Sequence, residues 1–191
     1  MKNEIGNNFP IYLEGKNIYL TPFTRDHLEM KDYWLWLNNL DTTKNLGIHD
    51  YVMPVSFEKL TEYFDNNAFK ANNILFAVME KKSNKFIGTV RVSHINWISR
   101  TAVIGILLGD LSSRGKRFAS EMTRLAVDYI FNVLNLNKIT ASAHSANIPS
   151  LKCFRGLNFL DEGILKKQLF IDGKYYDIIN MALFKKDYLN N

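Results

Sequence analysis

Residues 102–122 read AVIGILLGDLSSRGKRFASEM, and this stretch decides how the rest of the chain is interpreted. Its apolar start predicts a buried strand that stops at Gly109-Asp110. A polar turn follows, and the regular apolar spacing after the turn predicts a helix. Backbone N–H groups at a helix start are unpaired and lie at the positive end of the helix dipole. The strand, turn and helix together predict a binding site for a phosphorylated ligand.

The turn carries three cationic side chains, Arg114, Lys116 and Arg117, around Gly115. Glycine accepts backbone geometry that a Cβ would resist. The spacing is not that of a Walker loop, because no Gly-Lys-Ser/Thr closes a second glycine, and the Gly-x-Gly-x-x-Gly fingerprint of dinucleotide sites is absent. The two usual nucleotide-binding motifs are therefore poor fits to this turn.

Size and composition indicate one folded domain. A chain of 191 residues is long enough for a substantial core, and its 47% apolar and 13% aromatic content excludes a disordered protein. We expect residues 1–10 to be a flexible leader and residues 11–188 to form the domain. The start lacks the apolar stretch of a signal peptide, and no run is long enough to span a bilayer. The single cysteine, Cys153, fits a reducing cytoplasm and excludes an intrachain disulfide or a cysteine-based zinc site.

The net charge of +5 and the pI of about 9.2 raise the question of nucleic-acid binding. The lysines are scattered over turns and late strands, as is typical of solvated faces, and no nucleic-acid-reading motif accompanies them. An anionic small ligand explains the cluster Arg114–Arg117 more economically. We therefore expect neither nucleic acid, nor a membrane, nor a metal as a partner.

Alternating and helical patterns give the order β-α-α-β-β-β-α-β-α-β-β, which is an α/β fold with a sheet of mixed direction. The first half is expected to contain a strand at Ile18–Phe23, a helix at Asp26–Asn38 capped by Thr24, an irregular loop at Asp41–Pro54, a helix capped by Ser56, a hairpin turning at Lys81–Asn84, and a central strand at Arg100–Leu108.

The helix after the turn places Phe118, Met122, Leu125, Tyr129 and Val133 on one stripe, which we expect to face the core. The strand Lys138–His144 must run parallel to the strand before that helix, because a long crossover separates the two. The remaining elements are a short helix from Asn147 to Phe154, a strand at Glu162–Phe170, a turn at Asp172-Gly173 and a return strand at Tyr175–Phe184.

Three segments, in this order on these elements, resemble the GNAT superfamily of acetyl-CoA-dependent N-acetyltransferases, and in particular its RimJ/RimL-like branch, which includes spermidine and amino-sugar acetyltransferases. Residues 114–119 are similar to the family's Arg/Gln-x-x-Gly-x-Gly/Ala pyrophosphate turn. Asn147-x-x-Ser150 running to Leu157-Asn158-Phe159 resembles its Asn-x-x-Ser … Lys-Leu-Gly-Phe helix. Residues 161–181 resemble the closing hairpin of the branch.

The resemblance implies a single-domain GNAT-like sheet whose central parallel strands splay apart and admit acetyl-CoA as co-substrate. The coenzyme arm would pair with the free strand edge as an added strand does. The resemblance places the cofactor on Ile106, Leu107, Leu108, Arg114, Gly115, Lys116, Arg117, Phe118, Ala119, Ser120, Asn147, Ser150 and Phe154. For catalysis at such a site, the residues expected to act are the backbone N–H of Leu108 at the splay point, His144 at the strand end, and Asn147.

The chain departs from the family pattern at three positions. Arg117 stands where the family has Gly, so its side chain must swing away from the phosphates or bind them in two-pronged fashion. Phe154 stands where many members have a Tyr that is assigned as general acid, and Phe has no proton to donate. A thiol leaves tolerably as thiolate, with protonation by a water or a nearby hydroxyl. Asn158 replaces a usual Gly, and Asn also tolerates left-handed geometry.

Several other residues are candidates for the general base that the attacking amine needs. His144 ends a strand beside the expected carbonyl site, while His94, His49 and Asp110 are alternatives. Cys153 could form a covalent acetyl intermediate, but no base or acid lies near it in sequence. Candidates for an acceptor pocket are Tyr51, Trp97 and Tyr175.

The function expected is transfer of acetyl from acetyl-CoA to a primary amine by direct attack in a ternary complex. We favour a nucleotide-linked amino sugar as acceptor, on the likeness of residues 95–102 to the amino-sugar enzymes of the branch and on the basic surface. A protein N-terminus or another small amine is the alternative, and a polyamine ranks low because Leu35–Ile48 offers one carboxylate, Asp41. A non-catalytic acyl-CoA-binding module is the alternative from another class. By analogy, the exposed edge of the closing hairpin makes a homodimer plausible.

Overall fold

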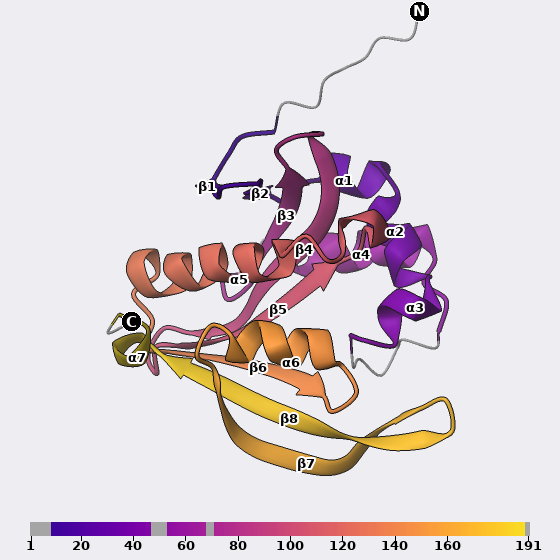
Figure 1. The fold of residues 1–191 in the computed structure, drawn as a ribbon. Coiled ribbons are helices and arrows are strands. Elements are labelled where there is room, and N and C mark those ends of the chain that lie inside the picture. Colours follow the sequence, from indigo (N-terminus) through magenta and orange to yellow (C-terminus); the bar gives the residue numbers. More distant parts are fainter. Residues whose placement is uncertain (1–8, 47–52, 68–70, 190–191) are drawn as a thin grey trace, which may run out of the picture.

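One eight-stranded sheet organises the molecule in the computed structural model, which describes residues 9–46, 53–67 and 71–189 (Figure 1). The strand order is β1-β2-β3-β4-β5-β6-β8-β7, and every neighbouring pair is antiparallel except β5 and β6. The strands are β1 (Leu13–Glu14), β2 (Ile18–Pro22), β3 (Ile74–Glu80), β4 (Lys85–Asn96), β5 (Thr101–Leu108), β6 (Lys138–His144), β7 (Leu160–Ile171) and β8 (Lys174–Phe184).

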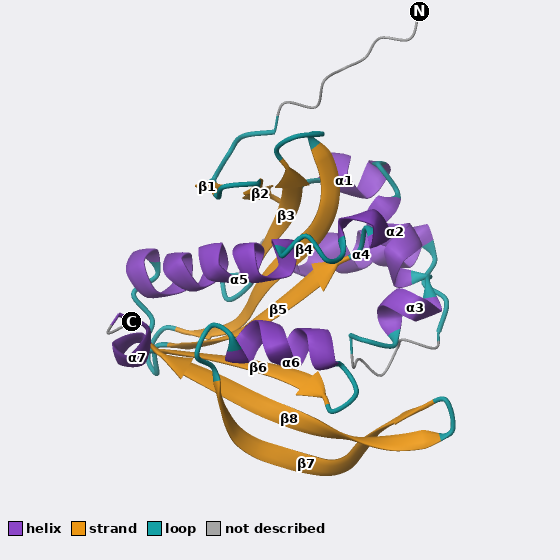
Figure 2. Cartoon of the chain, viewed as in Figure 1, coloured by secondary structure: helices purple, strands orange, loops and turns teal. Residues whose placement is uncertain are grey.

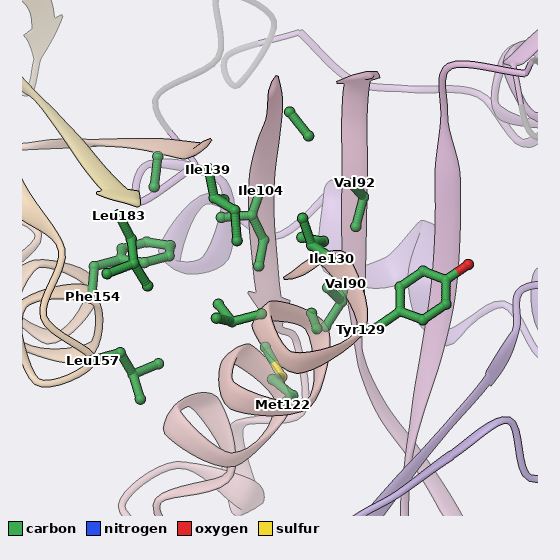
Figure 3. Packing of buried hydrophobic residues seen from close by; sticks show 14 of the residues in the cluster. Val90, Val92, Ile104, Met122, Tyr129, Ile130, Ile139, Phe154, Leu157 and Leu183 are labelled. Atoms are coloured by element: carbon green, nitrogen blue, oxygen red, sulfur yellow. The ribbon is translucent and has the colours of Figure 1, made fainter. Parts of the chain in front are cut away.

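Helices cover both faces of the sheet and create two apolar layers (Figure 2). On one face pack α5 and α6, and on the other pack the N-terminal helices α1, α2 and α4. Figure 3 shows Met122 and Ile130 of the first layer near Val90 of β4 and Ile104 of β5, and Tyr129 packs edge-on against Phe76 of β3. The helices are α1 (Arg25–Glu29), α2 (Asp32–Leu37), α3 (Leu40–Thr43), α4 (Phe57–Asn67), α5 (Phe118–Asp128), α6 (Ile148–Arg155) and α7 (Lys185–Leu189).

The expected α/β order and the single parallel pair are confirmed. The turns at Lys81–Asn84 and Asp172-Gly173 join antiparallel strands as expected. Asp172 and Gly173 both have positive φ, 49° and 77°, which is the conformation that two-residue hairpin turns require. The part of the chain that the structure describes contains no helix long and apolar enough to cross a bilayer.

The continuous helix expected at Asp26–Asn38 is wrong, because the chain breaks it at Lys31. Lys31 has φ 62°, and its N–H donates to the carbonyl of Leu28 at 2.9 Å, which ends α1. The break redirects α2 so that Trp36 packs into the second apolar layer. A further short helix, α3, occupies the start of the segment expected to be irregular.

The apolar stripe of the long helix is confirmed except at Val133, whose side chain is 64% exposed. Residues Tyr129–Val133 form a π-helical turn, in which the N–H of Leu134 donates to the carbonyl of Tyr129 at 3.0 Å. The extra residue in this turn rotates the helix face. Ile130 and Phe131 lie in the core, and Val133 is turned toward solvent.

Candidate functional site

The parallel strands β5 and β6 separate after a short ladder, and Figure 1 shows them diverging from a common start. Their pairing runs from Thr101–Lys138 to Val103–Thr140 and stops there. On the other edge of β5, the N–H of Gly109 donates to the carbonyl of Ile87 at 3.1 Å. Backbone groups of successive residues alternate between the two edges of a strand, so Ile106 and Leu108 direct theirs toward β6. A free strand edge thus borders the gap.

A cleft of about 670 Å³ opens beside this gap. Its walls come from α2 and α3, from β3 to β5, from the turn before α5, and from α6. The walls include many of the residues that the sequence assigned to the cofactor: Ile106, Leu107, Leu108, Arg114, Gly115, Ala119, Asn147, Ser150 and Phe154.

Asp110 holds the turn that leads to α5. Its carboxylate accepts hydrogen bonds from the hydroxyls of Ser112 and Ser113, each at 2.6 Å, and from Lys85 at 2.8 Å. Burial acts to raise the pKa of Asp110, but Lys85 and the two hydroxyls outweigh it and hold the pKa at about 2. Such a carboxylate is a poor proton acceptor at neutral pH, so Asp110 closes the turn and is not the base.

The start of α5 offers unpaired backbone N–H groups to an anion. Gly115 has φ 78°, and the N–H groups from Gly115 to Ser120 have no hydrogen-bond partner within the described chain. Arg114 lines the cleft beside them. Because unpaired helix-start amides and an arginine are the groups that bind phosphate, this turn fits the diphosphate of a coenzyme.

Four of the expected cofactor residues do not line the cleft with their side chains. Lys116 pairs with Glu80 at 3.4 Å and lies over the ring of Phe118, which is itself buried in the core. Ser120 and Arg117 are exposed. These four residues can therefore contribute backbone N–H groups to the site, while their side chains point elsewhere.

Arg117 occupies the N-cap of α5 with φ 64°, a left-handed conformation that costs a residue with a Cβ about 1–2 kcal/mol. The glycine typical of the resembling family removes that cost. We expect Arg117→Gly to raise the free energy of unfolding by roughly 1 kcal/mol, measured by urea denaturation. Ser120→Gly is the control, because helical geometry at position 120 makes glycine destabilising there. A loss of stability in Arg117→Gly would contradict this account.

Asn147 and Phe154 line the cleft and also help to hold α6 in place. The side chain of Asn147 accepts the N–H of Ser150 at 3.2 Å and donates to the carbonyl of Asn45 at 2.9 Å, which joins α6 to the segment after α3. Phe154 is 2% exposed and packs edge-on against Phe159. Asn158 adopts φ 66°, as the sequence predicted for its position.

The expected histidine base lies near the site and behind its wall. His144 is 4% exposed, lies outside the cleft lining, and makes no standard ring hydrogen bond within the described residues. Burial lowers the pKa of His144 below its ordinary value, and the backbone carbonyl of Lys44 opposes this shift. The imidazole is therefore neutral at physiological pH, which is the protonation state that a base requires.

The other candidates from the sequence are placed elsewhere. His94 is exposed at an irregularity of β4, and Trp97 and Tyr175 are also exposed and absent from the cleft lining. His49 and Tyr51 lie outside the described residues. Cys153 does line the cleft, and its sulfur lies 3.5 Å from the hydroxyl of Thr123, while the described lining of the cleft contains no histidine or carboxylate that could serve it as a base.

Sequence reasoning missed a whole wall of the cleft. The missed residues come from the N-terminal helices, from β3 and β4 and from β6, and the main ones are Tyr33, Leu37, Thr42, Asn45, Leu46, Leu75, Thr89, Arg91 and Ser142. Arg91 and Arg114 are the only charged residues among the described lining, and no carboxylate is among them. A polar position on a strand was the one sequence signal for Arg91, and it does not distinguish a cleft from a solvated face.

An amide-lined helix start beside a splayed parallel strand pair is the arrangement that the resemblance to the acetyl-CoA-dependent transferases implied. The pattern that describes the acetyltransferase (GNAT) domain matches residues 17–159, and the chain belongs to this family. It is an acetyl-CoA-dependent N-acetyltransferase.

The chain is similar to bacterial N-acetyltransferases. It is 30% identical over 156 residues to the spermidine N(1)-acetyltransferase of Vibrio cholerae serotype O1, which covers 81% of this chain and 89% of that protein. It is 35% identical over 178 residues to the SPbeta prophage-derived uncharacterized N-acetyltransferase YokL of Bacillus subtilis, covering 93% and 95%. The crystal structure of the Vibrio cholerae spermidine N-acetyltransferase with CoA and spermine superimposes with a TM-score of 0.82 at 27% identity, covering 92% of this chain and all of that one.

Proposed function

We propose that the cleft binds acetyl-CoA and a primary amine together, and that the acceptor amine belongs to a molecule with an anionic group, such as a nucleotide-linked amino sugar. The observation that carries the choice of acceptor is the charge of the cleft. Its described walls hold Arg91 and Arg114 and no carboxylate. A polyamine is a polycation and needs carboxylates to bind, whereas an anionic amino sugar matches two arginines.

The residues that would hold the coenzyme follow from the free backbone groups. The amides from Gly115 to Ser120 would bind its diphosphate, and Arg114 would add a charged contact. The edge of β5 at Ile106 would pair with the amides of its arm. Ser150 and Phe154 would line the arm from α6.

Acetyl-CoA supplies an activated acyl group when bound. The residues of this chain would position the two substrates and accept or donate the protons that move during the transfer. The N–H of Leu108 would donate to the carbonyl oxygen as charge develops on it. His144, neutral through its lowered pKa, is the candidate base from the sequence, but its ring nitrogens are buried behind the cleft wall, so the wall would have to open before His144 could accept the amine proton. Ser150, one helical turn before Phe154, has the hydroxyl closest in sequence to the position where family members carry Tyr, and would donate a proton to the departing sulfur.

A second candidate is acetylation of spermidine, which is the activity named for the similar Vibrio cholerae protein. The similarity over most of both chains favours it. The RimJ/RimL-like branch, which also includes enzymes of ribosomal proteins, remains a prediction, as does a cytoplasmic location. The family match favours an enzyme over the non-catalytic module.

Release of the CoA thiol with different amines tests the proposal. We expect kcat/KM for glucosamine 6-phosphate or a nucleotide-linked amino sugar to exceed that for spermidine and for a peptide with a free N-terminus by at least about tenfold, the size of one charge-assisted contact. A spermidine preference of the same size would replace the proposed acceptor with the polyamine. Equal rates for all amines would mean that the cleft does not select by charge.

A further inference from the structure

Arg91 lines the cleft from the β4 side. It lies on β4, where it pairs with Leu75 of β3 and with Gly105 of β5. Gly105 has no side chain, and apart from its own chain neighbours no atom lies within 4 Å of the position that a Cβ would occupy there. The side chain of Arg91 is half-buried, lines the cleft, and also borders an adjoining hollow of about 40 Å³ beneath α1 and α4.

The Arg91 guanidinium has no anionic partner within the described chain. Its closest recorded contact is the ring of Tyr63, with the guanidinium carbon 5.9 Å from the ring centroid. The described linings of the cleft and of the hollow contain no carboxylate. Two other arginines of this chain differ in this respect, because Arg25 and Arg155 each bind an aspartate at 2.8 Å.

A half-buried guanidinium without a counterion is costly, because arginine does not lose its proton in proteins. An anion that enters the cleft would supply the missing partner. The planar guanidinium fits a carboxylate or phosphate through two parallel hydrogen bonds. Tyr33, whose pKa burial raises to about 12, remains a neutral hydroxyl beside it.

We propose that Arg91 determines acceptor specificity by binding a carboxylate or phosphate on the amine substrate. This assignment rests on the proposed function and narrows it to a substrate class. Gly105, which faces Arg91, is three residues before Leu108 on β5, so the two sites lie about 10 Å apart along the strand. The acceptor is therefore an amine whose anionic group lies within about 10 Å of the nitrogen.

Two probes that differ by one phosphate test the assignment: glucosamine 6-phosphate and glucosamine. The measurements are kcat/KM at saturating acetyl-CoA and calorimetric binding to the CoA-saturated protein. We expect the wild-type protein to prefer the phosphorylated probe, and Arg91→Gln to lower that preference, the ratio of the two kcat/KM values, about tenfold or more. Arg91→Lys keeps the positive charge but lacks the planar guanidinium that forms two parallel hydrogen bonds. It should therefore retain part of the phosphate preference that Arg91→Gln loses.

Two matched variants control for loss of charge. Arg114→Gln should raise the KM for acetyl-CoA and leave the phosphate preference intact, and Arg155→Gln, outside the cleft, should change neither. A phosphate preference that survives Arg91→Gln overturns the role of Arg91 alone. A wild-type protein that prefers spermidine, or that shows no phosphate preference in rate or binding, overturns both this assignment and the proposed acceptor.

Discussion

Replacing Leu108 with proline is expected to lower kcat by about 100- to 1000-fold, the cost typical of losing one oxyanion donor. The N–H of Leu108 faces the gap between β5 and β6, whereas the N–H of Gly109 is bonded to the carbonyl of Ile87. Proline at position 108 therefore deletes a donor that the sheet does not use. Steady-state kinetics with acetyl-CoA and the best amine acceptor measure the effect.

The control for this variant is Leu108→Ala, which trims the side chain and keeps the N–H. It should stay within a few-fold of the wild-type kcat, since the donor is intact. Thermal unfolding and acetyl-CoA calorimetry should show that Leu108→Pro is folded and still binds the coenzyme. If the proline and alanine variants lose the same activity, then the side chain of Leu108 matters and its N–H does not.

The parallel strand pair and the anion turn could be predicted because their signals are local, whereas the splay of the pair was implied by the family resemblance. An apolar strand, a polar turn with Gly115 and a long amphipathic helix are all contained in one stretch of sequence. The crossover length then requires a parallel partner strand. The structure confirms the pair and its separation beyond Val103 and Thr140.

The opposite wall of the cleft could not be predicted because distant segments build it. Alternation on β4 places Val90 and Val92 on one face of the strand and Arg91 on the other. From the sequence alone, the face that carries Arg91 is expected to be exposed to solvent. Whether that face is covered depends on how the N-terminal helices pack. That packing depends on the break at Lys31, where no glycine or proline marks the end of the helix.

The position of His144 shows the same limit. Its place at the end of β6 follows from the strand pattern, but its burial does not. The side chain of Asn147 bonds the backbone of Asn45, 102 residues away in sequence, and fixes the segment after α3 beside the strand end. Long-range contacts of this kind decide which candidate base faces the cleft. The pattern of apolar and polar residues does not predict such contacts.

The free energy of unfolding is expected to fall by up to about 3 kcal/mol between pH 6.5 and pH 4 because of His27. His27 is fully buried, and its Nδ1 accepts the N–H of Thr24 at 3.0 Å. The rings of Phe9 and Phe23 stack on it at 4.0 and 5.3 Å, and Nε2 has no partner in the described chain. Burial lowers the pKa of His27 to about 4, although the charge of Asp26 opposes the shift.

Between the folded pKa of about 4 and the unfolded value of 6.5, the unfolded chain binds a proton that the folded chain refuses. Stability is therefore full above pH 6.5 and declines as the pH falls toward 4. Urea titrations at pH 7.5, 6.0 and 5.0 measure the decline. Carboxylates with lowered pKa values, such as Asp110 and Glu121, lose their contribution mainly as the pH falls below about 4.5, which is below the lowest pH of these titrations.

His27→Gln isolates the contribution of this one imidazole. Glutamine at the third position after Thr24 completes a regular capping box, so the start of α1 keeps its hydrogen bonds without a titrating ring. His144 has a lowered pKa too, and it contributes the same slope to both proteins. The difference between wild type and variant thus belongs to His27. A variant that loses stability with falling pH as steeply as the wild type would show that the buried ring at position 27 is protonated in the folded state.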